Sequence, residues 1–152
     1  MTQQRETMPL ATASTRRSDA GARQATVRRS RVIAVLAAGA AGLLGWVAAD
    51  PLLGVDLTVQ TGGTATMREV GPVAAVLAGL MSGLAGWLLL AVLERFTARA
   101  GSLWRAIALL TLVVSLVGTL DAVTTAATAA LATLHVLVGA TVLVLLPRTA
   151  SW

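Results

Sequence analysis

The sequence predicts an all-α integral membrane protein, a bundle of four transmembrane helices that run up and down. Its composition is the first reason, because 56% of the 152 residues are hydrophobic and 12% are charged, whereas soluble domains carry about 25% charged residues. The second is four long apolar stretches, each able to cross a bilayer core roughly 30 Å thick. The third is the spacing of Gly and Ala, which recur on one helix face and favour close packing in lipid. We therefore expect one membrane domain, residues 32–146.

Residues 1–31 differ from the rest of the chain in being polar and basic. They hold seven of the twelve arginines and two of the seven acids, which accounts for the whole net charge of +5. With few large apolar side chains to bury, they are predicted to form a disordered cytoplasmic tail. The expected partner is the anionic lipid headgroup, because the basic run ends where the first span begins. Nucleic acid is not expected, because the tail lacks aromatic residues for base stacking.

The first span is predicted over residues 32–49, and Asp50-Pro51 ends it because proline disfavours helical geometry in the residue before it. A second interpretation is a twin-arginine signal peptide that begins at Arg28-Arg29 and is cleaved after the apolar run. This run is longer than the usual signal core of about 7–15 residues. It also carries a small face that a discarded peptide would not need, made of Ala38, Gly42, Gly45 and Ala49.

The loop over residues 50–70 contains two β-prone runs, 55–60 and 64–70, on either side of Thr-Gly-Gly at 61–63. This pattern predicts a short extracytoplasmic hairpin. A lone hairpin is only marginally stable in water, so it would have to rest on the bundle or on a partner.

The second span, residues 71–93, has proline in its first turn, where the missing N–H costs nothing. Small residues recur on it every four positions and form a groove for the close approach of another helix. The members of this face are Gly71, Ala75, Gly79 and Gly83, with Ser82 and Gly86 beside them. The groove could pair two protomers, but similar faces on the other spans favour packing within one chain.

The third and fourth spans are predicted over residues 103–120 and 126–146, and residues 147–152 form the C-terminus. Trp104, near the start of the third span, is expected at the membrane interface. The small or polar faces are Ala108, Thr111, Ser115 and Gly118 in the third span and Thr128, Ala132, His135 and Gly139 in the fourth. We expect all four small faces to close a common interior rather than to line a pore or ligand cavity.

The arginines predict the orientation. With four spans, the tail, residues 94–102 and the C-terminus share one side, which carries eleven of the twelve arginines when Arg105 is included. The other side has Arg68 and four acids. The positive-inside rule then places both termini in the cytoplasm.

His135 is the only histidine and the only ionisable residue deep in a predicted span. It lies about nine residues, or roughly 14 Å, below the outer end of its helix, at a depth similar to that of Thr111. A neutral His135 hydrogen-bonded to Thr111 or Ser115 would join two helices, with a contribution of about 0.6 kcal/mol. The functional alternative is a proton-relay or ligand-contact residue, as intramembrane ionisable groups often are.

Catalysis and metal binding are not expected. Ser115, His135 and Asp121 could be written as a triad, but Ser115 lacks the Gly-x-Ser-x-Gly elbow and the chemistry would need water. One histidine without any cysteine does not suffice for a zinc site. The four acids of the outer side could bind a hard cation, but they lack calcium-loop spacing. We therefore expect no enzyme, cofactor or metal.

Two functions remain. The first is a non-enzymatic membrane component that assembles with itself or with another membrane protein, and its candidate packing residues are Gly42, Gly45, Gly79, Gly83 and Gly86. The second is an oligomeric transporter of a small solute or ion that uses His135 in the interior. Coupled transport usually needs an intramembrane carboxylate, and the predicted spans contain none, which favours the first.

Five short motifs lie within or beside the spans: Pro51–Thr58, Gly71-Pro72, Leu93–Thr97, Ser115-Leu116 and Leu134-His135. In this combination, residues 28–148 resemble a family of actinobacterial four-helix membrane proteins known only as a domain of unknown function. The resemblance implies a four-span fold in a bacterial inner (plasma) membrane. It implies no activity, ligand or catalytic residue.

Overall fold

Four long helices make up most of the chain in the computed structural model, which describes residues 10–60 and 67–149. The α-helices are α1 (Leu10–Val47), α2 (Pro72–Phe96), α3 (Ala100–Val117) and α4 (Thr125–Leu145). A short π-helix, Ala48–Leu52, extends α1, and 3-10 turns follow α3 at Gly118–Asp121 and α4 at Pro147–Thr149. All four helices are long and apolar enough to cross a membrane, which confirms that part of the prediction.

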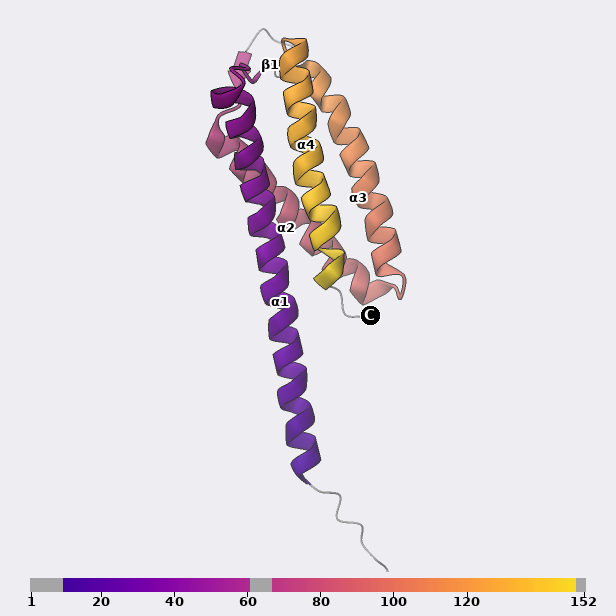
Figure 1. The fold of residues 1–152 in the computed structure, drawn as a ribbon. Coiled ribbons are helices and arrows are strands. Elements are labelled where there is room, and N and C mark those ends of the chain that lie inside the picture. The colour runs from indigo at the N-terminus through magenta and orange to yellow at the C-terminus, as the bar shows by residue number, and fades with distance from the viewer. Residues whose placement is uncertain (1–9, 61–66, 150–152) are drawn as a thin grey trace, which may run out of the picture.

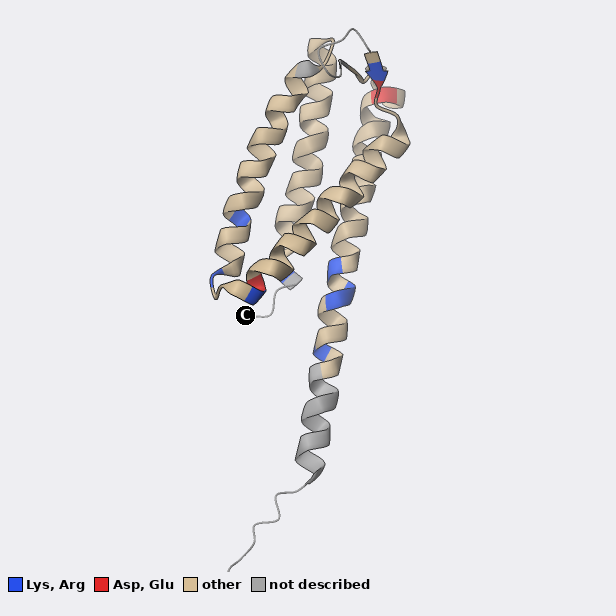
Figure 2. Cartoon of the chain, turned by 180° about the vertical axis from the view of Figure 1, so that it is seen from behind, with Lys and Arg blue, Asp and Glu red and all other residues tan. Residues whose placement is uncertain are grey.

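The helices run up and down, as Figure 1 shows. Helix α1 packs most extensively on α2 and α4, whereas α3 makes smaller contacts with α2 and α4. Helix α2 is inclined to the others, so it meets α3 at one end of the bundle and lies apart from it at the other (Figures 1 and 2). The N-terminal half of α1 extends beyond the bundle at the end where α2 leads into α3.

Charged residues lie towards the ends of the bundle and along the extension of α1 (Figure 2). The belt between them exposes large apolar side chains, among them Leu77, Leu88, Leu110, Val113 and Val114. In lipid, such side chains face acyl chains and need no protein cover. The surface therefore agrees with a membrane-embedded bundle.

The predicted disorder of the tail is wrong for residues 10–31, which continue α1 as one helix. The prediction considered only the lack of apolar burial. Ala, Arg and Gln are good helix formers, and once the span has nucleated a helix, each added residue gains a hydrogen bond without a new nucleus. Residues 1–9 lie outside the described residues.

An ion pair joins α1 to the end of α2. Arg31 Nη2 lies 2.6 Å and 2.8 Å from the two carboxylate oxygens of Glu94. The Arg31 side chain is 9% exposed and that of Glu94 31% exposed. Solvent therefore screens the pair only in part, and it holds α1 against α2 where α1 leaves the bundle.

The predicted strand pairing is confirmed in the described residues. Strands β1 (Thr58–Gln60) and β2 (Met67–Glu69) are antiparallel, with Val59 opposite Arg68; the predicted turn at 61–63 lies outside the described residues. Val59 also bridges to Ala122 in the α3–α4 connection. Leu57, which precedes β1, is fully buried against Ala49, Leu131 and Leu134. The hairpin thus rests on the bundle.

Glycine allows α1 and α2 to approach backbone to backbone. A Cβ atom on Gly79 would lie 2.3 Å from the Ala38 carbonyl oxygen, and one on Gly42 would lie 2.4 Å from that of Ala75. Gly83 faces the α1 backbone on the same side, and a Cβ there would lie 3.0 Å from Val35 Cα. These separations leave no room for a side chain, so the small faces of α1 and α2 close on each other.

Candidate functional site

A cavity of about 380 Å³ lies between α2, α3 and α4. The α2 wall consists mainly of small residues, of which Ala74, Ala78, Ser82 and Ala85 are exposed. Helix α4 supplies a mostly apolar back wall that includes Leu131, Leu134, His135, Val138 and Val142. Because these lining residues of α2 are exposed, the cavity is open to the outside of the bundle along α2.

The small face of α3 lines this cavity instead of closing it. Ala108, Thr111 and Ser115 all belong to the lining, and a Cβ on Gly118 would meet no atom within 4 Å. The prediction that all four small faces close a common interior is therefore wrong for α3. The physical reason is the inclination of α2, which carries its small face to α1 and away from α3.

The other packing candidates face different neighbours. A Cβ on Gly45 would lie 2.6 Å from a methyl group of Leu134, and one on Gly86 would lie 3.1 Å from Val142. Both glycines therefore face α4. Gly139 of α4 lies against Leu112 of α3, where a Cβ would come within 2.8 Å.

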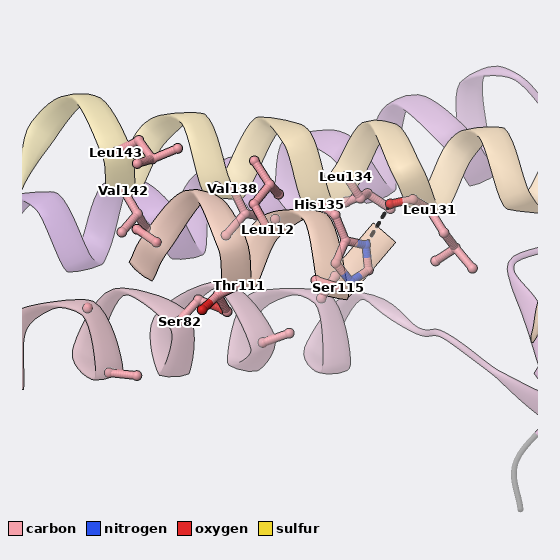
Figure 3. A pocket seen from close by; sticks show the side chains of 18 of the residues that line it. Ser82, Thr111, Leu112, Ser115, Leu131, Leu134, His135, Val138, Val142 and Leu143 are labelled. Atoms are coloured by element: carbon pink, nitrogen blue, oxygen red, sulfur yellow. Dashed lines mark hydrogen bonds between the residues drawn. The ribbon is translucent and has the colours of Figure 1, made fainter. Parts of the chain in front are cut away.

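The polar side chains of the cavity come from three helices, with Ser82 and His135 near the middle of α2 and α4 and Ser115 in the last turn of α3. His135 is in the middle of α4 (Thr125–Leu145), about 15 Å from either end at 1.5 Å per residue. Ser82 of α2 and Thr111 and Ser115 of α3 line the same cavity as His135, as the close view in Figure 3 illustrates. The fold therefore places one imidazole and three hydroxyls in an otherwise apolar cavity.

His135 makes its hydrogen bond within its own helix and not, as predicted, to Thr111 or Ser115. Its Nδ1 lies 2.7 Å from the Leu131 carbonyl oxygen. A carbonyl only accepts, so Nδ1 carries the proton and donates. In the neutral ring, Nε2 is then a hydrogen-bond acceptor. Because His135 bonds to the preceding turn of α4, it holds no helices together and keeps Nε2 for the cavity.

The cavity hydroxyls differ from the other hydroxyls of the bundle. Thr128, Thr133 and Thr141 of α4 each donate to the carbonyl four residues earlier in their helix, the usual arrangement for threonine in a transmembrane helix. No such bond forms at Ser82, Thr111 or Ser115 among the residues that the structure describes. Ser82 and Thr111 are exposed. No buried side-chain nitrogen or oxygen in the described parts lacks a partner, so the Ser115 hydroxyl and Nε2 of His135 are accessible as well.

Trp104 closes the cavity where α2 and α3 meet. Its side chain is fully buried, and its indole Nε1 donates to the Gly86 carbonyl over 2.9 Å. Trp104 lies near the start of α3, at the end of the bundle where an interface residue is expected, but its side chain points into the bundle. Sequence reasoning missed this role, and its signal was Gly86, since a glycine provides space for an indole ring on a facing helix.

Residues 22–151 match the model of a family of unknown function, DUF6069. This confirms the expectation of a domain of unknown function. No curated protein and no solved structure matches the chain.

Proposed function

The chain belongs to the DUF6069 family of unknown function, and we propose that it is a non-enzymatic membrane component that binds a partner taken from the bilayer. The observation that carries this proposal is the lateral cavity between α2 and α3, with small residues along its mouth and four polar groups inside. Its volume of about 380 Å³ falls in the range of small-molecule pockets, roughly 300–1,000 Å³.

The size of the cavity favours a small partner over a helix. A partner helix would need a groove along several turns, each 5.4 Å long and about 10 Å across, whereas the cavity is a single pocket of about 380 Å³. Assembly with a second copy or another membrane protein would use other faces, and the cavity supports binding of a bilayer-dissolved molecule.

Transport of a small solute or ion is the second candidate, and the position of His135 in the cavity is the observation that favours it. Two features favour binding instead. The cavity opens towards lipid and is closed at one end by Trp104. The described spans contain no Asp or Glu between the two ends of the bundle, and proton- or cation-coupled carriers usually use one.

Blocking the mouth of the cavity tests the proposal. In wild-type protein in bilayer nanodiscs, a fatty alcohol with a photoreactive diazirine in its chain should label the cavity walls, and excess unlabelled alcohol should compete. Ala78→Phe places a ring at the mouth, so we expect at least a tenfold loss of competable labelling, because the ring fills much of the space. Peptide mass spectrometry measures the label.

Leu77→Phe is the matched control. It adds the same ring to an exposed α2 position outside the cavity, and this variant should be labelled to the same extent as the wild type. Equal competable labelling of both variants would refute the proposed site.

We further propose that both termini lie in the cytoplasm of a bacterial cell and that the basic extension of α1 contacts anionic headgroups. The proposal is supported by the arginines, which gather at one end of the bundle and on this extension, whereas the opposite end carries Asp50, Asp56 and Glu69. Arginine near an anionic leaflet contributes about 1 kcal/mol per residue, which also favours the cytoplasmic side.

Single cysteines test this orientation, because the native chain has none. Met67→Cys in β2 and Ala98→Cys between α2 and α3 both fall at exposed positions. In spheroplasts, a membrane-impermeant maleimide should modify position 67 at once and position 98 only after permeabilisation. The reverse order of labelling would show that the orientation is inverted.

A further inference from the structure

We infer that the cavity binds a neutral, hydroxyl-bearing lipid, a long-chain or prenyl-type alcohol, whose O–H donates to Nε2 of His135. The inference rests on the proposed function and narrows it to one class of ligand. It follows from the hydrogen-bonding state of the cavity, the depth of His135 and the direction in which the cavity opens.

The donor on the ligand follows from the tautomer of His135. Since Nδ1 donates to the Leu131 carbonyl, the neutral ring offers only an acceptor to the cavity. A ketone, an ester or an ether also offers only acceptors and would leave Nε2 unmatched. An alcohol provides one donor, which matches Nε2.

Hydroxyls of α2 and α3 offer further hydrogen-bond partners to a ligand in the same cavity. Ser82, Thr111 and Ser115 all belong to its lining, together with His135 (Figure 3). None of the three is committed to a carbonyl of its own helix in the described structure, unlike Thr133 and Thr141. A hydroxyl of this set can therefore donate to a lone pair of the ligand oxygen, while the ligand O–H donates to Nε2 of His135.

Depth excludes a charged headgroup. The imidazole is about 15 Å from either end of α4, where an ionised group costs several kcal/mol. An ionised phosphate or carboxylate would also place acceptor oxygens beside Nε2, which is itself an acceptor and cannot donate to them. A single hydroxyl can reach this depth with a small loss of free energy, because it gives up only a few hydrogen bonds to water when it leaves the interface.

The rest of the ligand must be apolar, and its chain must extend out of the cavity through the mouth. The walls beside His135 are Leu131, Leu134 and Val138, and the mouth is flanked by Ala74 and Ala78. These side chains contact hydrocarbon without a polar mismatch. A chain can then extend between α2 and α3 into the bilayer, so the length of the ligand is not limited by the cavity volume.

A matched pair of competitors tests the inference. Hexadecanol and hexadecyl methyl ether have the same chain and differ in the donor. Each is titrated against the diazirine alcohol on wild-type protein in nanodiscs, and label at the cavity peptides is measured. We expect hexadecanol to compete about threefold to tenfold more effectively, the ratio that corresponds to one intramembrane hydrogen bond. His135→Leu should abolish this preference, whereas Thr133→Val, outside the cavity on the same helix, should retain it.

The outcomes separate this inference from the function on which it rests. Equal competition by the alcohol and the ether in the wild type would overturn the hydroxyl-to-histidine contact and leave a cavity that binds lipid chains. A preference that persists in His135→Leu would overturn the assignment of His135 as acceptor. Failure of both compounds to compete would overturn cavity binding itself. Should His135→Leu not fold, His135→Phe, which keeps an aromatic ring and removes the acceptor nitrogen, is expected to abolish the preference for the alcohol in the same way.

Discussion

Replacing Gly79 by alanine is expected to force α1 and α2 apart and to destabilise the bundle by about 1–3 kcal/mol, the usual range for overpacking. The added Cβ would lie 2.3 Å from the Ala38 carbonyl oxygen and 2.9 Å from its carbon. Both atoms belong to the backbone, so no side-chain rotation relieves the clash. The helices must separate along a face where Gly42 already meets the Ala75 carbonyl, and we therefore expect the upper end of the range.

Gly118→Ala is the matched control, because it makes the same chemical change on helical backbone where a Cβ would meet nothing within 4 Å. Thermal unfolding in detergent micelles, followed by far-ultraviolet circular dichroism, measures both variants. The midpoint of Gly79→Ala should fall by several degrees, and that of Gly118→Ala should stay within a degree or so of the wild type. If both midpoints stay at the wild-type value, α1 and α2 do not make the close backbone contact described above.

The number and kind of the helices follow from the sequence because they depend on local properties. A charge-free stretch must cross the membrane as a helix, since only a helix satisfies every backbone group within one segment. The small faces of α1 and α2 could also be predicted from the sequence, because glycines four residues apart lie on one side of a helix. Gly42 and Gly79 lie in that contact, as the spacing indicates.

The cavity could not be read from the sequence because it depends on how the helices cross. The small face of α3 has the same pattern as that of α1, yet one lines a space and the other closes it. The difference arises from α2, which follows α1 along its glycines and so diverges from α3. The spacing of residues in the sequence indicates which of them share a helix face, but it does not give the crossing angle between two helix axes.

The hydrogen bonds were unpredictable for a related reason. His135 had three candidate acceptors, and the carbonyl of Leu131 in its own helix is always within reach, whereas Thr111 and Ser115 depend on the distance between α3 and α4. An intrahelical bond needs no assembly, so it forms first and leaves the other nitrogen for a ligand.

Replacing Trp104 by alanine is expected to destabilise the bundle by about 2–3 kcal/mol. The indole is fully buried and packs in one cluster with Leu90, Val142 and Leu146. In soluble proteins such a truncation costs about 3–5 kcal/mol. The part due to transfer from water is smaller in lipid, so we expect mainly the part due to lost packing. The free space left would join the cavity and loosen α2 from α3 where they meet.

Trp104→Phe divides this effect into packing and hydrogen bonding. Phenylalanine keeps most of the aromatic contact and loses the bond to the Gly86 carbonyl, whose contribution is about 0.6 kcal/mol and at most about 1.7 kcal/mol. Thermal midpoints in micelles should therefore rank wild type above Trp104→Phe and Trp104→Ala lowest. A wild-type midpoint for Trp104→Ala would mean that the indole does not hold α2 against α3. The inclination of α2 would then depend on its contacts with α1 and α4, because the glycine face packs on α1 and Gly86 and Leu90 face α4.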